Sequence, residues 1–260
     1  MVEKIIHYSD LHLKLYKQHK RDRNVLKKAL EIWRKEKPDR IVFTGDFVHS
    51  KNQMTPELIH LMSWVMTETA KICKCIYLIG NHDFLENNMD RMDALSPIIE
   101  SLNNPNIVYY KDTGCHEDEN ILWCVYSLRE HNISPNIPLD TDKYKIGLFH
   151  GVIEGSSNDF GFVFDDGYSV DRFEGCDVVL AGDIHKKQTF KIPGNKKAYM
   201  VGSTIMQNFG ESIKNHGYGM YDIKTEKYRF FNLDNSQPYL NFKIKDIEDI
   251  ENEKEILING

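Results

Sequence analysis

The chain of 260 residues predicts an α/β fold in which two β-sheets pack face to face and helices lie outside them. Over about the first eighty residues, strand patterns alternate with helix patterns, which predicts parallel strands joined by right-handed crossovers. The second half is rich in strand patterns, and no linker rich in Gly or Ser separates it from the first. We therefore expect one large domain, residues 1–232, followed by an extension, residues 233–260.

Five elements are expected in the first part of the chain, and a sixth follows Asp90. In order they are a strand at 4–8, a helix capped by Asp22 and ended by Pro38, a strand at 40–44, a helix opened by Thr55-Pro56 and a strand at 75–79. Apolar residues at helical spacing support the helices, and proline is favoured in a first turn. The sixth element is a helix that Pro97 bends or breaks.

Seven strands are expected in the second half, each a short apolar or alternating run. They cover residues 121–126, 145–149, 177–180, 188–192, 198–201, 219–223 and 227–231. From Asn232 onward the alternation weakens and the chain turns acidic.

The composition is that of a folded domain. Hydrophobic residues make up 41% of the chain and the formal charge is −6, which excludes intrinsic disorder. The longest apolar run, 121–128, is far shorter than the roughly 18 residues that a membrane span needs. The N-terminus shows no signal peptide, and the five cysteines lack zinc-finger spacing. We therefore expect reduced thiols and a cytoplasmic or nucleoid-associated protein, with no membrane partner.

Basic residues gather in two places along the chain. Seven Lys or Arg residues lie between Lys14 and Lys28 against one acid, and a second basic group lies between Lys186 and Lys197. An acidic protein can hold a polyanion through local groups of this kind. A solvated lysine-rich helix and loop would give the same pattern, so charge alone leaves both interpretations open.

Five of the predicted strands end in Asp, Asn or His, most of them beside a glycine. The C-terminal ends of parallel strands meet at one edge of a sheet, where α/β proteins place their sites. We therefore expect seven side chains to converge there: Asp10, His12, Asp46, Asn81, His150, Asp183 and His185.

This set of side chains has the composition of a metal site. Three carboxylates packed together would repel one another and raise their pKa values unless cations lay between them. With His and Asn added and no Cys, the donors suit Mn, Fe or Zn rather than Ca. Seven ligands exceed the needs of one tetrahedral zinc but fit two ions that share a carboxylate. Such a pair clamps the attacking and leaving oxygens of a phosphoryl displacement.

The order of the motifs resembles the calcineurin-like metallophosphoesterase superfamily, whose pattern is D-x-H, G-D, G-N-H-D, H and G-H-x-H. The matching residues are Asp10-Leu11-His12, Gly45-Asp46, Gly80-Asn81-His82-Asp83, His150 and Gly182-Asp183-Ile184-His185. Within the superfamily the chain looks most like the SbcD-type DNA-repair nucleases. It shares with them an extra histidine, His49, and the late elements Gly202-Ser203 and Phe209-Gly210-Glu211.

The resemblance implies a four-layer α/β/β/α sandwich with a dinuclear metal centre. One ion would be held by Asp10, His12, Asp46 and His185, and the other by Asp46, Asn81, His150 and Asp183. His82 would protonate the leaving oxygen or steady the developing charge, His49 would contact the scissile phosphate, and Asp83 would support the loops. Candidate substrate contacts are Lys14, Lys17, Arg21, Ser203 and Glu211.

One position departs from the pattern of the nucleases. Asp183 stands where they usually have the first histidine of G-H-x-H. Because Asp adds a negative charge and an oxygen donor, we expect Mn²⁺ to be the favoured ion, with Fe²⁺, Mg²⁺ or Zn²⁺ as alternatives.

By this resemblance the chain is expected to be a DNA nuclease that hydrolyses phosphodiester bonds at or near DNA ends, as an exonuclease, a single-strand endonuclease or both. The alternative is a metal-dependent phosphatase or phosphodiesterase acting on a small molecule or a phosphoprotein, and a metal-free scaffold is a third interpretation. The implied partners are DNA, a second copy in a homodimer and an SbcC-type coiled-coil ATPase. Residues 233–260 would begin a truncated DNA-capping region.

Overall fold

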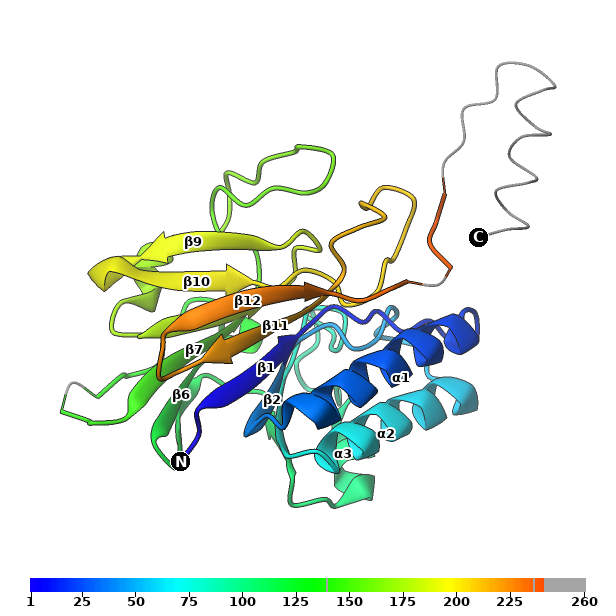
Figure 1. Cartoon of the computed structure of the whole chain (residues 1–260), viewed down its shortest axis with the longest axis horizontal. Helices are drawn as coiled ribbons and strands as arrows, with labels where there is room; N and C mark the ends of the chain where they lie inside the picture. The colour runs from blue at the N-terminus through cyan, green and yellow to red at the C-terminus, as the bar shows by residue number, and fades with distance from the viewer. Residues whose placement is uncertain (139, 236, 241–260) are drawn as a thin grey trace.

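The computed structural model describes residues 1–138, 140–235 and 237–240 of the chain. In these residues the strands form two six-stranded mixed sheets that lie face to face (Figure 1). The predicted pair of packed mixed sheets flanked by helices is therefore confirmed.

The first sheet contains four parallel strands: β1 (Lys4–Tyr8), β2 (Arg40–Thr44), β3 (Lys74–Leu78) and β4 (Ile107–Tyr110). Two late strands, β11 (Gly217–Asp222) and β12 (Lys227–Asn232), join it antiparallel, with β11 beside β1. The order of the sheet is β12-β11-β1-β2-β3-β4, so the two ends of residues 1–232 lie in the same sheet.

Three helices pack on the outer face of this sheet: α1 (His19–Glu36), α2 (Pro56–Ala70) and α3 (Ser96–Leu102) (Figure 1). Alternate strand residues such as Tyr8 and Phe43 belong to this layer, where the Tyr8 ring lies 5.0 Å from that of the buried Trp33. Thr55 caps α2 as predicted, because its hydroxyl accepts the Leu58 N–H at 3.3 Å.

The second sheet also contains four parallel strands: β6 (Ile121–Tyr126), β7 (Tyr144–His150), β8 (Val178–Gly182) and β10 (Lys196–Met200). Its edge strands, β5 (Gly114–Asp118) and β9 (Gln188–Ile192), are antiparallel, and the order is β5-β6-β7-β8-β10-β9. Its outer face packs against the 3₁₀ turn η2 (Val170–Phe173) and the loops around it. There are two further 3₁₀ turns: η1 (Leu128–Glu130) follows β6, and η3 (Pro193–Asn195) links β9 to β10.

The core between the sheets is built from the strand side chains that point inward, away from the helices of the first sheet and the loops of the second. Ile5 and Val42 of the first sheet pack in one fully buried cluster with Trp123 and Leu148 of the second. Apolar burial of this kind fixes how the two sheets sit on each other. It thereby brings the C-terminal ends of both sets of parallel strands to one edge.

Two helix boundaries differ from the prediction. Helix α1 begins at His19, so Asp22 is not its cap; its buried carboxylate instead pairs with Arg21 at 2.8 Å. Pro97 lies in the first turn of α3 rather than bending the helix. A proline is tolerated there because the N–H that it lacks has no partner within the helix.

Two strands, β4 and β5, were not predicted. The residues of β4 are only half buried, and β5 carries the polar run His116-Glu117-Asp118, so neither shows a clear apolar alternation. Both are edge strands, which bury less apolar surface than central ones.

Most of the predicted extension, residues 241–260, lies outside the described residues. Its first residue, Leu233, is described: it is buried, and its N–H donates to the His216 carbonyl at 2.8 Å. Within the described ranges, no helix has both the length and the apolar character that crossing a bilayer requires.

Candidate metal centre

The loops after β1, β2, β3, β7 and β8 converge at one edge of the sandwich, as predicted. The first sheet supplies Asp10, His12, Asp46 and Asn81, and the second supplies His150, Asp183 and His185. The site therefore joins the two sheets.

The loops after β1 and β2 run side by side and are joined by backbone hydrogen bonds. The N–H of Asp10 donates to the Gly45 carbonyl at 3.1 Å, and the N–H of His12 donates to the Asp46 carbonyl at 3.0 Å. Asp10, His12, Asp46 and Asp183 all have positive φ, between 42° and 100°. In a residue other than glycine this conformation costs about 1–3 kcal/mol, and it gathers at functional sites.

Asp10, His12 and His185 form one group of donor atoms. Nε2 of His185 lies 3.0 Å from Nε2 of His12 and 4.0 Å from Oδ1 of Asp10. Nε2 of His12 also lies 3.3 Å from Oδ2 of Asp46. These four residues are those predicted for the first ion.

A second group of donors surrounds His150. Its Nε2 lies 3.3 Å from Oδ1 of Asp46, 3.6 Å from Oδ1 of Asp183 and 3.0 Å from the side-chain amide of Asn81. The two oxygens of Asp46 thus face the two groups separately, one toward His12 and the other toward His150. A ligand shared between two ions needs this position.

The electrostatics of the cluster suit cations. Asp10 and Asp46 are 0% and 2% exposed, and no Lys or Arg in the described part of the chain pairs with either. Burial raises the pKa of Asp10, and burial with nearby carboxylates raises the pKa of Asp183 to about 6. Burial disfavours a charged His150, yet Asp46 and Asp183 raise its pKa above the usual value. Buried carboxylates require a positive counter-charge, so this donor set could hold divalent ions.

Two of the histidines are oriented by hydrogen bonds at the nitrogen that points away from the cluster. Nδ1 of His150 donates to the Thr44 carbonyl at 2.5 Å, and Nδ1 of His185 donates to Oε1 of Glu211 at 2.6 Å. In the neutral rings, both bonds place the proton on Nδ1 and leave the lone pair on Nε2, the atom that faces the cluster. Histidines that bind metals are commonly held in this way.

Glu211 and Ser203, predicted as substrate contacts, both lie beside His185; Ser203 is buried, and Glu211 is mostly buried but also lines a cavity next to His185. The side chain of Glu211 is 7% exposed, and its Oε2 accepts the N–H of Gln207 at 2.7 Å. Ser203 is fully buried and its hydroxyl lies 2.9 Å from Nδ1 of His216. The two residues fix the loop 201–216 around His185.

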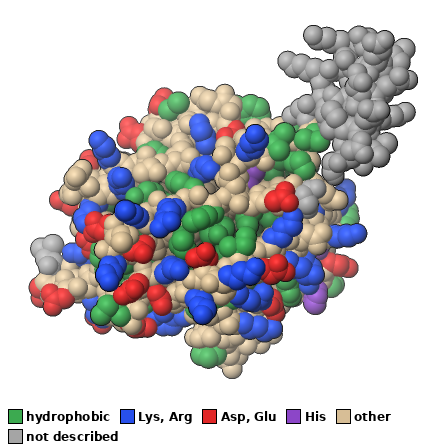
Figure 2. All heavy atoms as spheres, in the orientation of Figure 1, with side chains coloured by type: hydrophobic (Ala, Val, Ile, Leu, Met, Phe, Trp, Pro, Cys, Tyr) green, Lys and Arg blue, Asp and Glu red, His purple; other side chains and the backbone are tan. Residues whose placement is uncertain are grey.

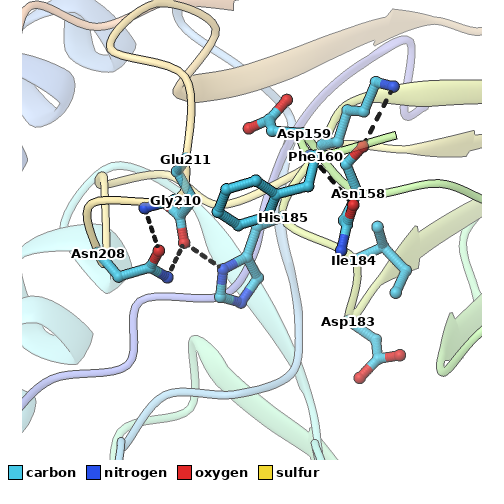
Figure 3. A pocket seen from close by; sticks show the side chains of 10 residues that line it. Asn158, Asp159, Phe160, Asp183, Ile184, His185, Asn208, Gly210 and Glu211 are labelled. Atoms are coloured by element: carbon cyan, nitrogen blue, oxygen red, sulfur yellow. Dashed lines mark hydrogen bonds and ion pairs between the residues drawn. The ribbon is translucent and has the colours of Figure 1, made fainter. Parts of the chain in front are cut away.

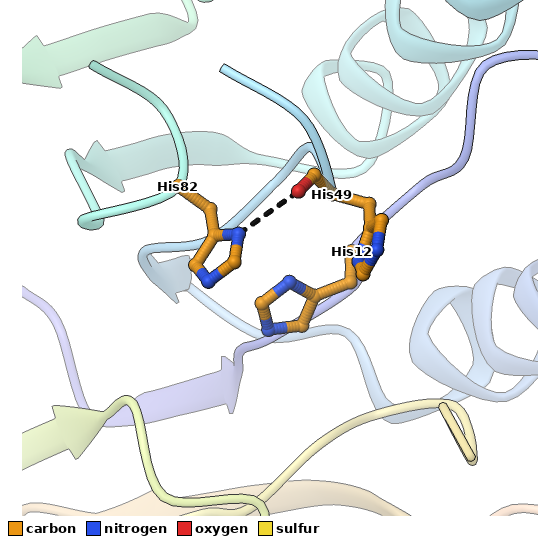
Figure 4. Close-up of side chains that lie close together, drawn as sticks. All are labelled: His12, His49 and His82. Atoms are coloured by element: carbon orange, nitrogen blue, oxygen red, sulfur yellow. Dashed lines mark hydrogen bonds between the residues drawn. The ribbon is translucent and has the colours of Figure 1, made fainter. Parts of the chain in front are cut away.

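His49 and His82 lie close to the ring of His12 (Figure 4). The ring centroid of His12 is 4.7 Å from that of His82 and 6.0 Å from that of His49. Nδ1 of His82 donates to the His49 carbonyl at 2.9 Å, and the N–H of His82 donates to Oδ1 of Asp46 at 2.8 Å. These bonds fix the His82 ring and leave Nε2 as the nitrogen available to a substrate.

Asp83 ties the loops after β2 and β3 together from behind, the supporting role predicted for it. Its buried carboxylate accepts hydrogen bonds of 2.9–3.1 Å from the backbone N–H groups of Asp46, Phe47, Val48 and Gly80.

The three basic candidates for substrate contact fall into two environments. Lys14 and Lys17 line a cavity of about 330 Å³ that also borders Tyr16 and His49, here named the His49 cavity. Arg21 is only 7% exposed, because its guanidinium pairs with Asp22 and lies 5.2 Å from the ring of Tyr239. It packs against the protein and does not line that cavity.

A second cavity of about 250 Å³, the His185 cavity, opens beside Asp183 and His185 and is walled by Phe160 and Lys186 (Figure 3). Phe160 was not predicted as a functional residue. The available signal was three phenylalanines at positions 160, 162 and 164 in an otherwise polar segment. Lys51 was also missed; its Nζ donates to the Asn81 carbonyl at 3.1 Å.

Similar proteins agree with this architecture. The calcineurin-like phosphoesterase family model matches residues 3–187. The uncharacterized protein R555 of Acanthamoeba polyphaga mimivirus is 31% identical over 264 residues, which cover 96% of this chain and 19% of R555. The chain thus spans about a fifth of the length of that relative.

Two solved structures are similar in fold. The protein TT1561 of Thermus thermophilus has a TM-score of 0.57 and 14% identity, over 89% of this chain and 99% of that one. A dimetal phosphatase from Danio rerio has a TM-score of 0.50 and 11% identity, over 85% and 93%. At such low identity these likenesses show the fold alone.

The family match reaches from β1 to the loop after β8, so it includes all seven residues of the metal cluster. The sequence motifs, the paired sheets and the Asp/His cluster agree with it. The chain belongs to the calcineurin-like phosphoesterases, a family of metal-dependent phosphoester hydrolases.

Proposed function

We propose that the protein is a dinuclear-metal-dependent nuclease that hydrolyses phosphodiester bonds at or near DNA ends. The observation that carries this proposal is the set of cavities around the metal cluster: the His49 cavity, the His185 cavity and a third of about 260 Å³ that borders Asn81 and Asp183. The His49 cavity and the His185 cavity border different histidines, and the ring of His12 lies near both, 6.0 Å from His49 and 4.8 Å from His185. A phosphodiester has a substituent on each side of phosphorus, whereas a monoester has one. Open space on more than one side of the His12 ring leaves room for both substituents of a diester and so favours it.

The residues divide the chemistry among them. Asp46 would be shared by both ions, with Asp10, His12 and His185 on one and Asn81, His150 and Asp183 on the other; bound divalent ions supply Lewis-acid activation of the phosphate and of water. The ligand set of oxygen and imidazole nitrogen, with the added charge of Asp183, favours Mn²⁺.

His82 is the group placed to handle the proton. The His49 carbonyl accepts from Nδ1 of His82 whether the ring is neutral or charged, so Nε2 can carry a proton and release it to the leaving oxygen. The exposed His49 ring is placed to contact the phosphate.

A nucleic-acid substrate is supported by the lysines of the two cavities. Lys14 and Lys17 border one and Lys186 borders the other. The whole chain has a formal charge of −6, and Figure 2 shows basic and acidic side chains interspersed over the visible face. The attraction for a polyanion is therefore local to the lysines of the His49 cavity, since the His185 cavity sets Lys186 beside Asp159, Asp183 and Glu211.

The test compares three substrates with Mn²⁺-loaded protein: a labelled single-stranded oligonucleotide, bis(p-nitrophenyl) phosphate and p-nitrophenyl phosphate. We expect the highest kcat/KM on the oligonucleotide, and a KM that rises steeply between about 50 and 200 mM salt because phosphate contacts release counterions. The aryl esters should show little salt dependence. Asp46→Asn serves as the inactive control.

Hydrolysis of the phosphomonoester without cleavage of the oligonucleotide would assign the protein to the alternative, a phosphatase. Oligonucleotide cleavage with a KM that does not respond to salt would remove the argument for a nucleic-acid groove.

A further inference from the structure

The His185 cavity has an aromatic wall that the proposed hydrolysis does not use. Phe160 lies in the long loop between β7 and η2, is 78% exposed and lines the cavity together with Asp183 and His185. Figure 3 shows Phe160, His185 and Glu211 around this space, with Asp183 beyond them. An aromatic side chain thus stands next to the residues that would hold the ions.

Phe160 is held in place although it is exposed. Its ring rests on Gly210, where a Cβ would come within 2.3 Å of two ring carbons, so a larger residue there would push the ring aside. Oδ1 of Asn158 accepts the N–H of Phe160 at 3.1 Å, and the N–H of Ser212 donates to Oδ2 of Asp159 at 2.9 Å. These bonds hold the loop backbone that presents the ring to the cavity, which lowers the entropic cost of binding.

A cationic side chain lines the same cavity. Nζ of Lys186 donates to the hydroxyl of Ser157 at 2.9 Å and to the Asn158 carbonyl at 3.4 Å. Within the described residues no carboxylate lies within ion-pair distance of this ammonium, so its charge is available to an anion.

A flat apolar face and a cation beside a phosphate-hydrolysing centre fit one nucleotide unit. Bases of every kind stack on aromatic side chains, which suits a nuclease without sequence preference. The cavity, at about 250 Å³, is smaller than the roughly 300–1,000 Å³ that drug-sized ligands occupy, so its size suits a single base.

We propose that Phe160 is the stacking platform for the nucleobase on one side of the scissile phosphate, and that Lys186 contacts the backbone phosphate next to that base. This inference rests on the proposed nuclease function and names a subsite within it.

The test removes the ring and the base separately and together. Wild type, Phe160→Ala and Phe162→Ala are compared on a single-stranded oligothymidylate and on versions that carry one abasic residue at successive positions around the cleaved bond. Phe162 is the matched control, because it is 61% exposed in the same loop but packs on Phe164 and does not line the cavity. Mn²⁺ stoichiometry confirms that each variant keeps its metal cluster.

On the intact oligonucleotide, Phe160→Ala should lower kcat/KM about 5- to 100-fold, while Phe162→Ala stays near wild type. On the substrate that lacks the stacked base, Phe160→Ala and wild type should be equal. A Phe160→Ala variant as active as wild type on the intact strand, or an equal loss on every abasic strand, overturns the subsite.

Binding is measured separately, by fluorescence quenching of a 2-aminopurine residue in the oligonucleotide. If wild type quenches the fluorescence and Phe160→Ala does not, the subsite is supported even where no strand is cleaved. The absence of cleavage would then refute the nuclease function but not the subsite. Equal quenching by both proteins overturns the subsite.

Discussion

Glu211 would act on the proposed metal centre through another residue, since of the seven candidate ligands its carboxylate bonds only to His185, at the nitrogen that points away from the cluster. Its buried carboxylate accepts from Nδ1 of His185 at 2.6 Å and from the amide of Asn208 at 2.9 Å. A carboxylate behind a histidine ligand fixes the ring and makes Nε2 a better donor. Glu211 is thus placed as a positioning residue, and its predicted role as a substrate contact stays a prediction, since it also lines the His185 cavity.

Replacing Glu211 should weaken one metal position and spare the other. We expect Glu211→Ala to lower the affinity of one Mn²⁺ equivalent about 10- to 100-fold, and Glu211→Gln, which keeps an acceptor oxygen but not the charge, to have a smaller effect. Calorimetric titration with Mn²⁺ measures both equivalents. Glu226→Gln, a half-exposed glutamate that pairs with Lys196, is the control. Two unchanged affinities in Glu211→Ala would contradict the assignment.

Asp183 is the residue at which this chain departs from the motif of the nucleases that its sequence resembles. Its Oδ1 lies 3.6 Å from Nε2 of His150, and its backbone N–H donates to Asp10 at 3.2 Å. Since it belongs to the His150 group alone, Asp183→Ala should lose metal at one position and keep the other. Mass spectrometry of the native protein after dialysis counts the ions. Retention of two full equivalents would show that Asp183 is not a ligand.

At the scale of the elements, the strand ends approach so closely that glycine is required where they meet. A Cβ on Gly182 would lie 2.1 Å from the hydroxyl oxygen of Ser9 and 2.4 Å from the Thr44 carbonyl oxygen, where the two sheets come together. A Cβ on Gly80 would lie 2.2 Å from the backbone nitrogen of Asp46. The glycines next to the ligands therefore permit the loops to pack, as well as to turn.

Gly80→Ala should displace Asp46 and so weaken both metal positions together, because both use its oxygens. Overpacking of this kind costs about 1–3 kcal/mol of folding free energy, which a domain of this size survives. Urea unfolding and Mn²⁺ titration would be measured side by side. Gly114→Ala is the control, because its nearest neighbour would be a side-chain atom at 3.5 Å. Normal metal binding in Gly80→Ala would show that the loop can shift without moving Asp46.

Elements with a strong local pattern could be predicted from the sequence, and so could the ligands that follow them. Asp46 and Asp183 come directly after glycines that end or follow buried strands, so parallel topology alone brings them to one edge. Glu211 lies in an irregular loop whose path no local pattern sets, so its contact with His185 is visible only in three dimensions. Asp22 has the residue type of a cap, but its burial beside Arg21 keeps it inside the helix.

At the scale of the whole molecule, a buried histidine should make the fold sensitive to acid. His7 lies in β1 with no exposed surface, and its nitrogens lie 2.8 Å from the hydroxyl of Tyr228 and 2.9 Å from that of Thr44. Burial lowers its pKa to about 3, whereas the unfolded chain takes up the proton near pH 6.5. The contribution of His7 to the free energy of unfolding is therefore fully present above pH 6.5 and is lost as the pH falls toward 3.

The free energy of unfolding should fall by about 1.6 kcal/mol between pH 6.5 and pH 5 through His7 alone. His7→Gln removes the titrating group, so its urea midpoint should change less over that range than that of wild type, with a chelator present in both series. Equal slopes for the two proteins would mean that His7 does not control the acid response.

The expected homodimer and the expected SbcC-type ATPase partner remain predictions, and they rest on the family resemblance. The viral relative extends well beyond the length of this chain, and this chain matches only 19% of it. The described residues account for the hydrolase fold and its candidate metal centre.

Because the candidate ligands come from both sheets, bound ions would link the two sheets to each other. Contacts such as that between Nδ1 of His150 and the Thr44 carbonyl already join the two halves at this edge. Coordination would add a linkage term to stability that grows by about 1.4 kcal/mol for each tenfold rise in free ion above the dissociation constant. The melting temperature would then rise and fall with the concentration of free divalent ions. Loss of the ions would make the protein easier to unfold and to proteolyse, as well as inactive.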